Sequence, residues 1–357
     1  GIYNGSAAVT MVNTASGVIG TSGTGSAAML DLSAAGGGTL TNHGSLTTSG
    51  DDSYGMAAET SGDALINGGT ITTTGVRSYG LFANGGAAGP GNTTLTNNGF
   101  IDVSGSNAHG IVSLDASPGL VTNTGSIIAH GAGGLGAFFA QGVTLNNTTG
   151  ARIVSEQDNA IDANGGGTFT NAGTISGANE GLSIVGGGAV IVNSGVIQGG
   201  TNLAISTIGP YAITITNTGQ IASAGGVAVW TDTGVNTFNM NGGTVTGLIR
   251  QGSGINTFVM QAGQVDSVDQ GGPQPRFTLN GGRVTGGLTN GGAVTITGGR
   301  IGSVALTAAQ NTFTMSGGQI DTNLTAGSGD TNFKLSGGAI GGVVTLGNGA
   351  NTIAVTG

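Results

Sequence analysis

The sequence predicts an all-β fold: a parallel β-helix, or solenoid, of about 16 coils with about three short strands in each coil. Two short phrases recur along the 357 residues, apolar residues alternate with polar or small ones inside each phrase, and glycine occupies 77 positions. Alternation with a period of two is typical of a strand that buries one face. One such coil cannot cover its own apolar face, whereas stacked coils can.

The first repeat, over residues 1–235, contains the phrase T-N-x-G-x-I at intervals of about 25 residues, and the variable segments between the phrases are expected to form loops. Asparagine suits a corner because it tolerates the left-handed region and bonds to nearby backbone. Stacked asparagines can also pair amide to amide. The repeated residues are Asn13, Asn42, Asn67, Asn97, Asn123, Asn147, Asn171, Asn193 and Asn217.

The second repeat, over residues 236–357, is tighter, with coils of about 19 residues built on the phrase N-T-F-x-M-x-G-G-x-V. Two apolar columns lie two residues apart and predict one strand, and a third apolar column after the glycines predicts the next. The second glycine of each pair is expected to turn the corner, because glycine tolerates a positive φ. These glycines are Gly243, Gly263, Gly282, Gly299, Gly318 and Gly338.

We expect the two repeats to form one continuous structural domain. The sequence begins without a signal peptide and ends inside a repeat, so the chain is expected to be a fragment of a longer polypeptide. It also has no run of about 20 apolar residues that would predict a membrane-spanning helix.

The composition argues against several classes of function. The chain has 16 acidic and seven basic residues, a net charge of −9 and no cysteine. Nucleic acid is not an expected partner because its binding requires a basic surface, and disulfides and thiolate metal sites are excluded. Only three histidines occur, no serine-protease phrase is present and the carboxylates are scattered. The sequence therefore predicts no enzyme, no cofactor and no metal site.

The T-N-x-G-x-I and N-T-F-x-M-x-G-G-x-V phrases, which cover nearly the whole chain, resemble the passenger domains of Gram-negative autotransporters (type V secretion). This group includes pertactin and the self-associating adhesins. The resemblance implies a right-handed parallel β-helix that is secreted through a carboxy-terminal outer-membrane barrel, which this chain lacks. It also implies an extracellular location, at the bacterial surface or released from it.

The longest return segment, NGGAAGPGN, is a candidate binding loop, because loops on a regular scaffold often carry function. The alternative is a glycine-rich excursion without a role. The candidate residues are Asn84, Gly85, Gly86, Pro90 and Asn92.

Three ring-bearing residues, Tyr54, Tyr79 and His109, each precede a glycine on successive coils and are expected to stack. They form a candidate binding stripe, with a purely structural stack as the alternative. The closest group of carboxylates is Asp51, Asp52, Glu59 and Asp63. It is a candidate acidic patch, with ordinary solvated charges as the alternative.

The sequence favours a non-enzymatic surface adhesin that attaches to host cells or to other bacteria through many weak contacts. The expected partner is a host-cell receptor, a glycan or another copy of the chain. One alternative is an enzyme that acts on polysaccharide with the carboxylates of residues 51–63. The other is a spacer stalk that displays a separate domain.

Overall fold

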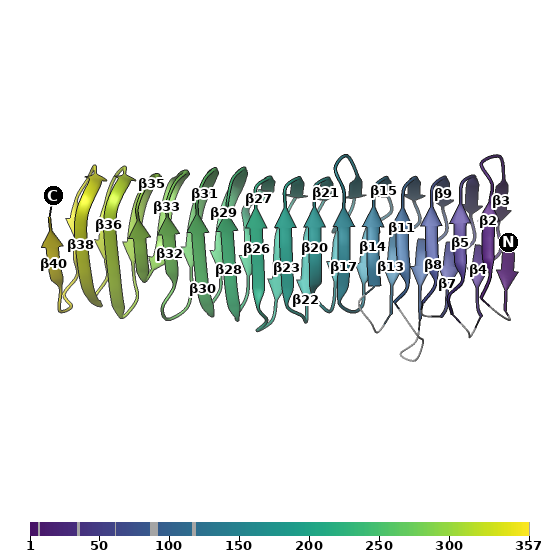
Figure 1. Ribbon diagram of the computed structural model, residues 1–357, viewed down its shortest axis with the longest axis horizontal. Coiled ribbons are helices and arrows are strands. Elements are labelled where there is room, and N and C mark those ends of the chain that lie inside the picture. The colour runs from purple at the N-terminus through teal and green to yellow at the C-terminus, as the bar shows by residue number, and fades with distance from the viewer. Residues whose placement is uncertain (6–7, 34–35, 61, 86–91, 116–118, 357) are drawn as a thin grey trace. The chain divides into compact units, whose positions relative to one another are not determined.

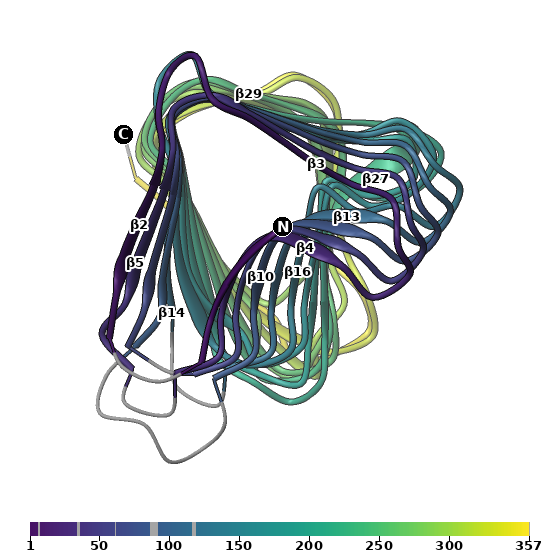
Figure 2. The same ribbon diagram turned by 90° about the vertical axis from the view of Figure 1, so that its right-hand side faces the viewer.

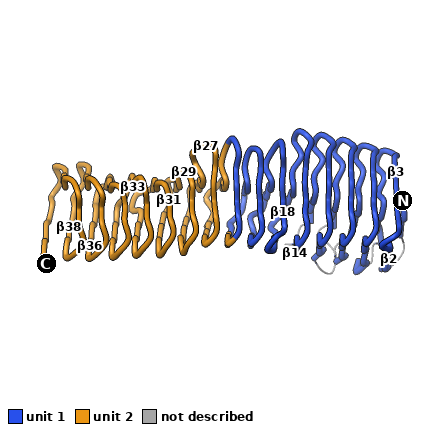
Figure 3. The backbone as a smooth tube through the Cα atoms, turned by 90° about the horizontal axis from the view of Figure 1, so that it is seen from above, with its two compact units in different colours: residues 1–189, 195–201 blue, residues 190–194, 202–357 orange. Residues whose placement is uncertain are grey.

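The computed structural model describes residues 1–5, 8–33, 36–60, 62–85, 92–115 and 119–356. These residues form two compact units: unit 1 contains residues 1–189 and 195–201, and unit 2 contains residues 190–194 and 202–357 (Figure 3). Each unit is an all-β parallel solenoid, as the sequence predicts (Figure 1). No helix occurs in the described ranges, so none there is long and apolar enough to cross a membrane.

Unit 1 consists of three columns of parallel strands, and each coil contributes one strand to each column. The first column is β2 (Thr10–Asn13), β5 (Thr39–Asn42), β8 (Ala64–Asn67), β11 (Thr94–Asn97), β14 (Gly119–Asn123), β17 (Val143–Asn147) and β20 (Gly167–Asn171). The second is β3 (Val18–Thr21), β6 (Ser45–Thr48), β9 (Thr70–Thr73), β12 (Phe100–Val103), β15 (Ser126–Ala129), β18 (Arg152–Ser155), β21 (Thr174–Gly177) and β24 (Val196–Gly199). The third is β1 (Ile2–Asn4), β4 (Ala27–Asp31), β7 (Tyr54–Ala58), β10 (Tyr79–Ala83), β13 (His109–Ser113), β16 (Ala137–Phe139), β19 (Ile161–Ala163) and β22 (Leu182–Val185).

Unit 2 contains the last asparagine phrases and all of the shorter coils. Its first column is β23 (Ala189–Asn193), β26 (Ile213–Asn217), β28 (Val235–Met240), β30 (Ile255–Met260), β32 (Arg276–Leu279), β34 (Ala293–Ile296), β36 (Gln310–Ile320), β38 (Asp330–Ile340) and β40 (Thr352–Val355). The other strands are β25 (Ile205–Ile208), β27 (Gln220–Thr231), β29 (Thr244–Gln251), β31 (Gln264–Gln270), β33 (Arg283–Gly291), β35 (Arg300–Leu306), β37 (Leu324–Ala326) and β39 (Val344–Thr345). The coil number roughly matches the prediction of about 16.

The second and third strands of a coil are often fused in unit 2. Strand β29 pairs with β31 through Val245 and again through Leu248, and a register shift between them marks the corner. The coil is therefore bent rather than interrupted at this point. The right-handed sense of the coil remains a prediction from the resemblance of the repeats to autotransporter passenger domains.

The repeated asparagines form a buried ladder of amides. In unit 1 the side-chain Nδ2 of each asparagine donates to Oδ1 of the next, from Asn13 to Asn171, over 2.7–2.9 Å. In unit 2, Asn193 donates to Asn217 in the same way. The expected amide-to-amide pairing is confirmed.

The expected left-handed backbone at these asparagines is wrong. Positive φ at described non-glycine residues occurs only at Asp52, Arg77, Asn107 and Asn290. The repeated asparagines end strands of the first column instead. Inside the core, their amides form hydrogen bonds with one another in place of hydrogen bonds with water.

The glycine corners of the shorter coils form as predicted. All six of the predicted corner glycines have φ between 67° and 88°. At Gly243 an added Cβ would also lie 1.9 Å from the carbonyl oxygen of Gly219, so a larger residue would collide with the coil before it. The short repeat therefore requires glycine for both its backbone conformation and its close stacking.

Candidate functional site

The three ring-bearing residues form a continuous stack on unit 1. Tyr54, Tyr79 and His109 begin strands β7, β10 and β13, and the parallel pairing holds them in register. The ring centroids of Tyr54 and Tyr79 are 5.7 Å apart, and those of Tyr79 and His109 are 5.3 Å apart with planes within 6°. All three side chains are partly exposed.

The glycine that follows each ring explains why the ring faces outward. A Cβ on Gly55 would lie 2.3 Å from Cγ2 of Ile71 and 2.6 Å from the carbonyl oxygen of Gly80. Only glycine fits this inward position, and the side chain before it lies on the opposite face of the strand.

Two phenylalanines enlarge the stack, and the sequence analysis missed both. The ring of Phe82 stacks on Tyr54 at 4.6 Å with planes within 8°, and Phe138 lies 6.2 Å from His109. Phe82 packs with Ala57 and Val112 in a small cluster apart from the main core. The sequence indicates such an outward residue at the pairs Leu81–Phe82 and Ile111–Val112. Neighbours in a regular strand face opposite ways, so one apolar side chain of each pair lies on the outer face of the strand.

We name Tyr54, Tyr79, Phe82, His109 and Phe138 the ring ladder. Its histidine is a neutral member of the stack. Burial lowers the pKa of His109 from 6.5 to about 4, and Asp158 opposes this shift only weakly. The ring Nδ1 accepts a hydrogen bond of 3.0 Å from the backbone N–H of Leu135, so the proton of the neutral ring lies on Nε2.

Carboxylates and amides lie beside the ring ladder. Asp162 occupies the register position of Phe138 on the next coil. Its Oδ1 accepts a bond of 2.8 Å from Asn159, whose own Oδ1 accepts from Asn179 Nδ2 at 2.9 Å and from the backbone N–H of Glu180 at 3.0 Å. Burial is the main cause that raises the pKa of Asp162, and the charges of Asp158 and Glu180 add to it. The outer face thus passes from aromatic rings to a polar, acidic group.

This acidic group was also missed. Asp158, Asp162 and Glu180 are separated by other residues in the sequence, and no phrase links them. Only the stacking of coils brings Glu180 beside Asp158 and Asp162, which lie four residues apart on one coil. Among the residues that the structure describes, no group of three or more histidine, cysteine, aspartate or glutamate side chains could hold a metal ion.

The predicted acidic patch is divided between two corners. Asp51 and Asp52 lie in turns that connect the second and third columns, which project as the outermost lobe of unit 1 in Figure 2. Asp63 lies at the corner before β8, where it accepts a bond of 2.7 Å from the backbone N–H of Gly38 and one of 2.9 Å from Thr60. Glu59, exposed near that second corner, does not join Asp51 and Asp52.

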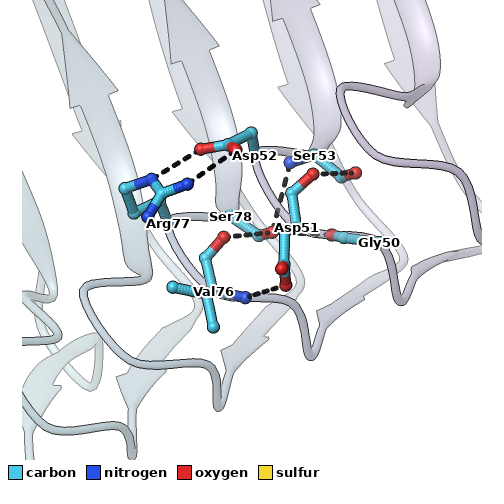
Figure 4. Close-up of polar contacts among 7 residues, drawn as sticks. All are labelled: Gly50, Asp51, Asp52, Ser53, Val76, Arg77 and Ser78. Carbon is cyan, nitrogen blue, oxygen red and sulfur yellow. Dashed lines mark hydrogen bonds and ion pairs between the residues drawn. The ribbon is translucent and has the colours of Figure 1, made fainter.

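Asp51 and Asp52 bind the next coil (Figure 4). Arg77 donates to both oxygens of Asp52 at 2.7 and 2.8 Å, and the bond from Arg77 is the main cause that lowers the pKa of Asp52. Asp51 accepts from the backbone N–H of Val76 at 2.9 Å. The basic partner of Asp52 therefore comes from the neighbouring coil.

A serine ladder lies under the same lobe. Ser78 Oγ donates to the carbonyl of Gly50 at 3.0 Å and accepts from the N–H of Ser53 at 3.2 Å (Figure 4). Ser53 Oγ donates to the carbonyl of Gly23 at 3.0 Å. Both serines are buried. The lobe is therefore a braced structural element, in which these carboxylates already have partners.

The candidate loop is described only at its ends. The N–H of Asn84 donates to Ala58 at 2.8 Å and that of Gly85 donates to Oδ1 of Asp115. Asn92 is exposed at the other end. Gly86 and Pro90 lie outside the described residues.

No family model, curated protein or solved structure matches this chain. The assignment of a function therefore depends on the chemistry of its surface.

Proposed function

We propose that the protein is a non-enzymatic bacterial surface adhesin and that the ring ladder is its contact surface. The observation that carries this proposal is the run of five rings on the outer face of one strand column, of which Phe82 is buried and the other four are partly exposed. Aromatic rings combine a large apolar face with specific contact geometry, and tyrosine adds a hydroxyl for hydrogen bonding.

The chemistry beside the rings supports a polar partner. Asn159, Asn179 and Asp162 offer amide and carboxyl groups at one end of the stack, while the hydroxyls of Tyr54 and Tyr79 lie along it. A glycan or a glycosylated host receptor presents both C–H faces and hydroxyls that suit such a surface. A second copy of the chain is the other candidate partner. Repeated weak contacts would add up to avidity at a cell surface.

The resemblance of the repeats to autotransporter passenger domains supports a location outside the cell. On this proposal the chain is a secreted passenger, at the bacterial surface or released from it, whose membrane link is a carboxy-terminal barrel. The absence of cysteine is compatible with such secretion.

The test displays the chain on a bacterium that does not aggregate and measures settling and attachment to host cells. We expect a gain in at least one measure, and a loss of at least about fivefold in that gain for Tyr79→Ala, because aromatic contacts dominate many interfaces. Phe100→Ser is the matched control, since Phe100 is an exposed ring on the second column of the same unit. No gain from the unaltered chain, or equal losses in both variants, would contradict the proposal.

A polysaccharide-acting enzyme is the second candidate, and Asp162 favours it. A carboxyl group with a raised pKa beside other carboxylates is a possible general acid, as in glycoside hydrolysis. The purified chain would be incubated with neutral and acidic polysaccharides, and new reducing ends or unsaturated products would be measured. Cleavage that Asp162→Asn abolishes would establish the enzyme and displace the adhesin. A spacer stalk would instead tolerate loss of whole coils without loss of attachment.

A further inference from the structure

Unit 2 contains a groove on the outer face of its first strand column. Two hollows of about 720 and 400 Å³ share Gln274, Arg276 and Gln310, and a third of about 230 Å³ adjoins them at Gln310 and Thr312. All lining residues belong to unit 2. The groove is thus separate from the ring ladder, and nothing in the proposed function uses it.

A short coil produces this groove. Gly282 and Gly299 are 17 residues apart, whereas the neighbouring repeats are longer, so the corner between β33 and β34 is reduced to Gly292. A Cβ on Gly292 would lie 2.9 Å from Cδ of Pro275 and 3.3 Å from Cβ of Ala308. The longer corners of the two neighbouring coils therefore lie on either side of this short corner.

The side chains across the groove have unequal lengths. Arg276, Ala293 and Thr312 occupy the same register position on three successive strands, β32, β34 and β36. The small Ala293 forms the floor, while the longer side chains of Arg276 and Thr312 rise on either side. This arrangement places a guanidinium group at the edge of a hollow.

Among the residues that the structure describes, Arg276 is a cation without a carboxylate partner. The ion pairs of the described residues engage Arg77, His130, Arg250 and Arg300, and none engages Arg276. The chain has a net charge of −9, yet the guanidinium group of Arg276 is exposed inside the groove and forms no ion pair with a described residue. Such a planar fork binds carboxylates through two parallel hydrogen bonds.

The rest of the lining suits a sugar. Gln274, Gln310, Thr295 and Thr312 supply amide and hydroxyl groups that both donate and accept hydrogen bonds. Ile255, which is 61% exposed, and Pro273 give the larger hollow an apolar wall for the C–H face of a ring. The volumes of the two larger hollows lie in the range of about 300–1,000 Å³ that is usual for small-ligand sites.

We propose that this groove binds an acidic saccharide, with the carboxylate of one sugar unit on Arg276 and the neighbouring units along the glutamines and threonines. The charges nearby set the direction of the ligand. Asp330 borders the adjoining hollow and accepts a bond of 2.7 Å from the N–H of Ala350, so the acidic unit belongs at the Arg276 end and a neutral unit near Asp330.

The test measures binding of the full chain to a panel of uronic acid and sialic acid oligosaccharides and to their neutral counterparts. We expect at least one acidic oligosaccharide to bind at least about tenfold more tightly than its neutral counterpart, because a bidentate charged pair in a groove provides more than one ordinary hydrogen bond. Arg276→Gln should lose this preference. Arg283→Gln is the matched control, since Arg283 is an exposed arginine of the same unit outside the groove.

A second variant separates loss of the site from loss of the fold. Ala293→Gln retains Arg276 but fills the floor, and it should weaken binding at least about tenfold while the thermal unfolding midpoint stays within a few degrees. The ring-ladder variant Tyr79→Ala should bind the acidic oligosaccharide normally, so failure of this inference and failure of the proposed adhesin are distinguishable. Equal binding of acidic and neutral sugars, no binding by the panel, equal competition by inorganic sulfate, or preference for an acidic peptide would each overturn the inference.

Discussion

The coils of the asparagine repeat and the coils of the aromatic repeat use one position of the first strand column for opposite chemistries. Within unit 2, Asn217 is in register with Met240, and Met240 is in register with Met260. Asn217 Nδ2 points at the sulfur of Met240 at 3.4 Å, where the amide ladder ends. The same buried position therefore accepts a chain of amides or a chain of apolar side chains.

The two chemistries tolerate change differently. An amide ladder is directional, because each asparagine donates to one neighbour and accepts from the other. The aromatic repeat stacks rings instead, with Phe258 and Phe277 at 5.2 Å and planes within 6°. The ring stack is interrupted at Val294, which packs in the Phe position without loss of register. Apolar columns thus allow substitutions that an amide ladder does not.

The largest effect is expected from Phe277→Ala. The side chain is buried between neighbouring coils, and its removal leaves a cavity, so unit 2 should lose about 3–5 kcal/mol of unfolding free energy. Trp230, the only tryptophan, reports on unit 2 in urea unfolding followed by fluorescence. Phe277→Leu is the control and should cost about 1 kcal/mol, as the native Val294 suggests. A similar loss in both variants would show that ring stacking itself, and not volume, stabilises the column.

A somewhat smaller loss, about 2–4 kcal/mol in unit 1, is expected from Asn97→Ala. The change removes the side-chain acceptor of Asn67 Nδ2, which keeps only the carbonyl of Phe100, and it removes the donor to Oδ1 of Asn123, both in the core. Hydrogen exchange of the amides in β8, β11 and β14 measures it. Asn98→Ala, at the exposed neighbouring position, should change exchange very little. Unchanged protection in Asn97→Ala would mean that water enters and replaces the amide.

The third expected effect depends on pH. The pKa of His109 in the folded chain is lowered to about 4, so between pH 6.5 and 4 the unfolded chain binds more protons than the folded one. The neutral ring therefore contributes fully to the free energy of unfolding above pH 6.5. As the pH falls toward 4, about 2–3 kcal/mol of this free energy is lost. Protonation also removes the acceptor for the N–H of Leu135.

The measurement is the difference in unfolding free energy between the unaltered chain and His109→Phe across this range. Burial raises the pKa values of Asp63, Asp115 and Asp162, so these groups change the unfolding free energy with pH in the direction opposite to His109. Their contributions are the same in both proteins and cancel in the difference. A difference that does not vary with pH would mean that His109 titrates normally and lies in contact with water.

The smallest effect is expected at the exposed lobe of unit 1. Arg77→Gly removes the ion pair with Asp52, whose side chains are 55% and 41% exposed, and also relieves a positive φ of 52°. These changes oppose each other, and exposed pairs are screened by salt. The urea midpoint should not shift measurably. A loss at low salt that disappears at high salt would instead show that the pair stabilises the lobe.

Much of the fold followed from the period of the repeats. The spacing of the asparagines and of the glycine pairs predicts the strand columns, their parallel pairing and the corner glycines. The stacking of Tyr54, Tyr79 and His109 followed from their equal place in successive coils. The ring ladder as a whole did not, because Phe82 and Phe138 resemble ordinary core residues until the face of each strand is known.

The sequence by itself determined which residues recur, and recurrence in a solenoid is enough to place equivalent side chains one above another. Only the tertiary structure decided what lies across a corner: the Arg77–Asp52 pair, the division of the acidic residues between two corners, and the meeting of Asp162 with Phe138. The physical reason is that residues about 25 positions apart become neighbours at a spacing of about 4.8 Å, so small differences in loop length decide which side chains face each other.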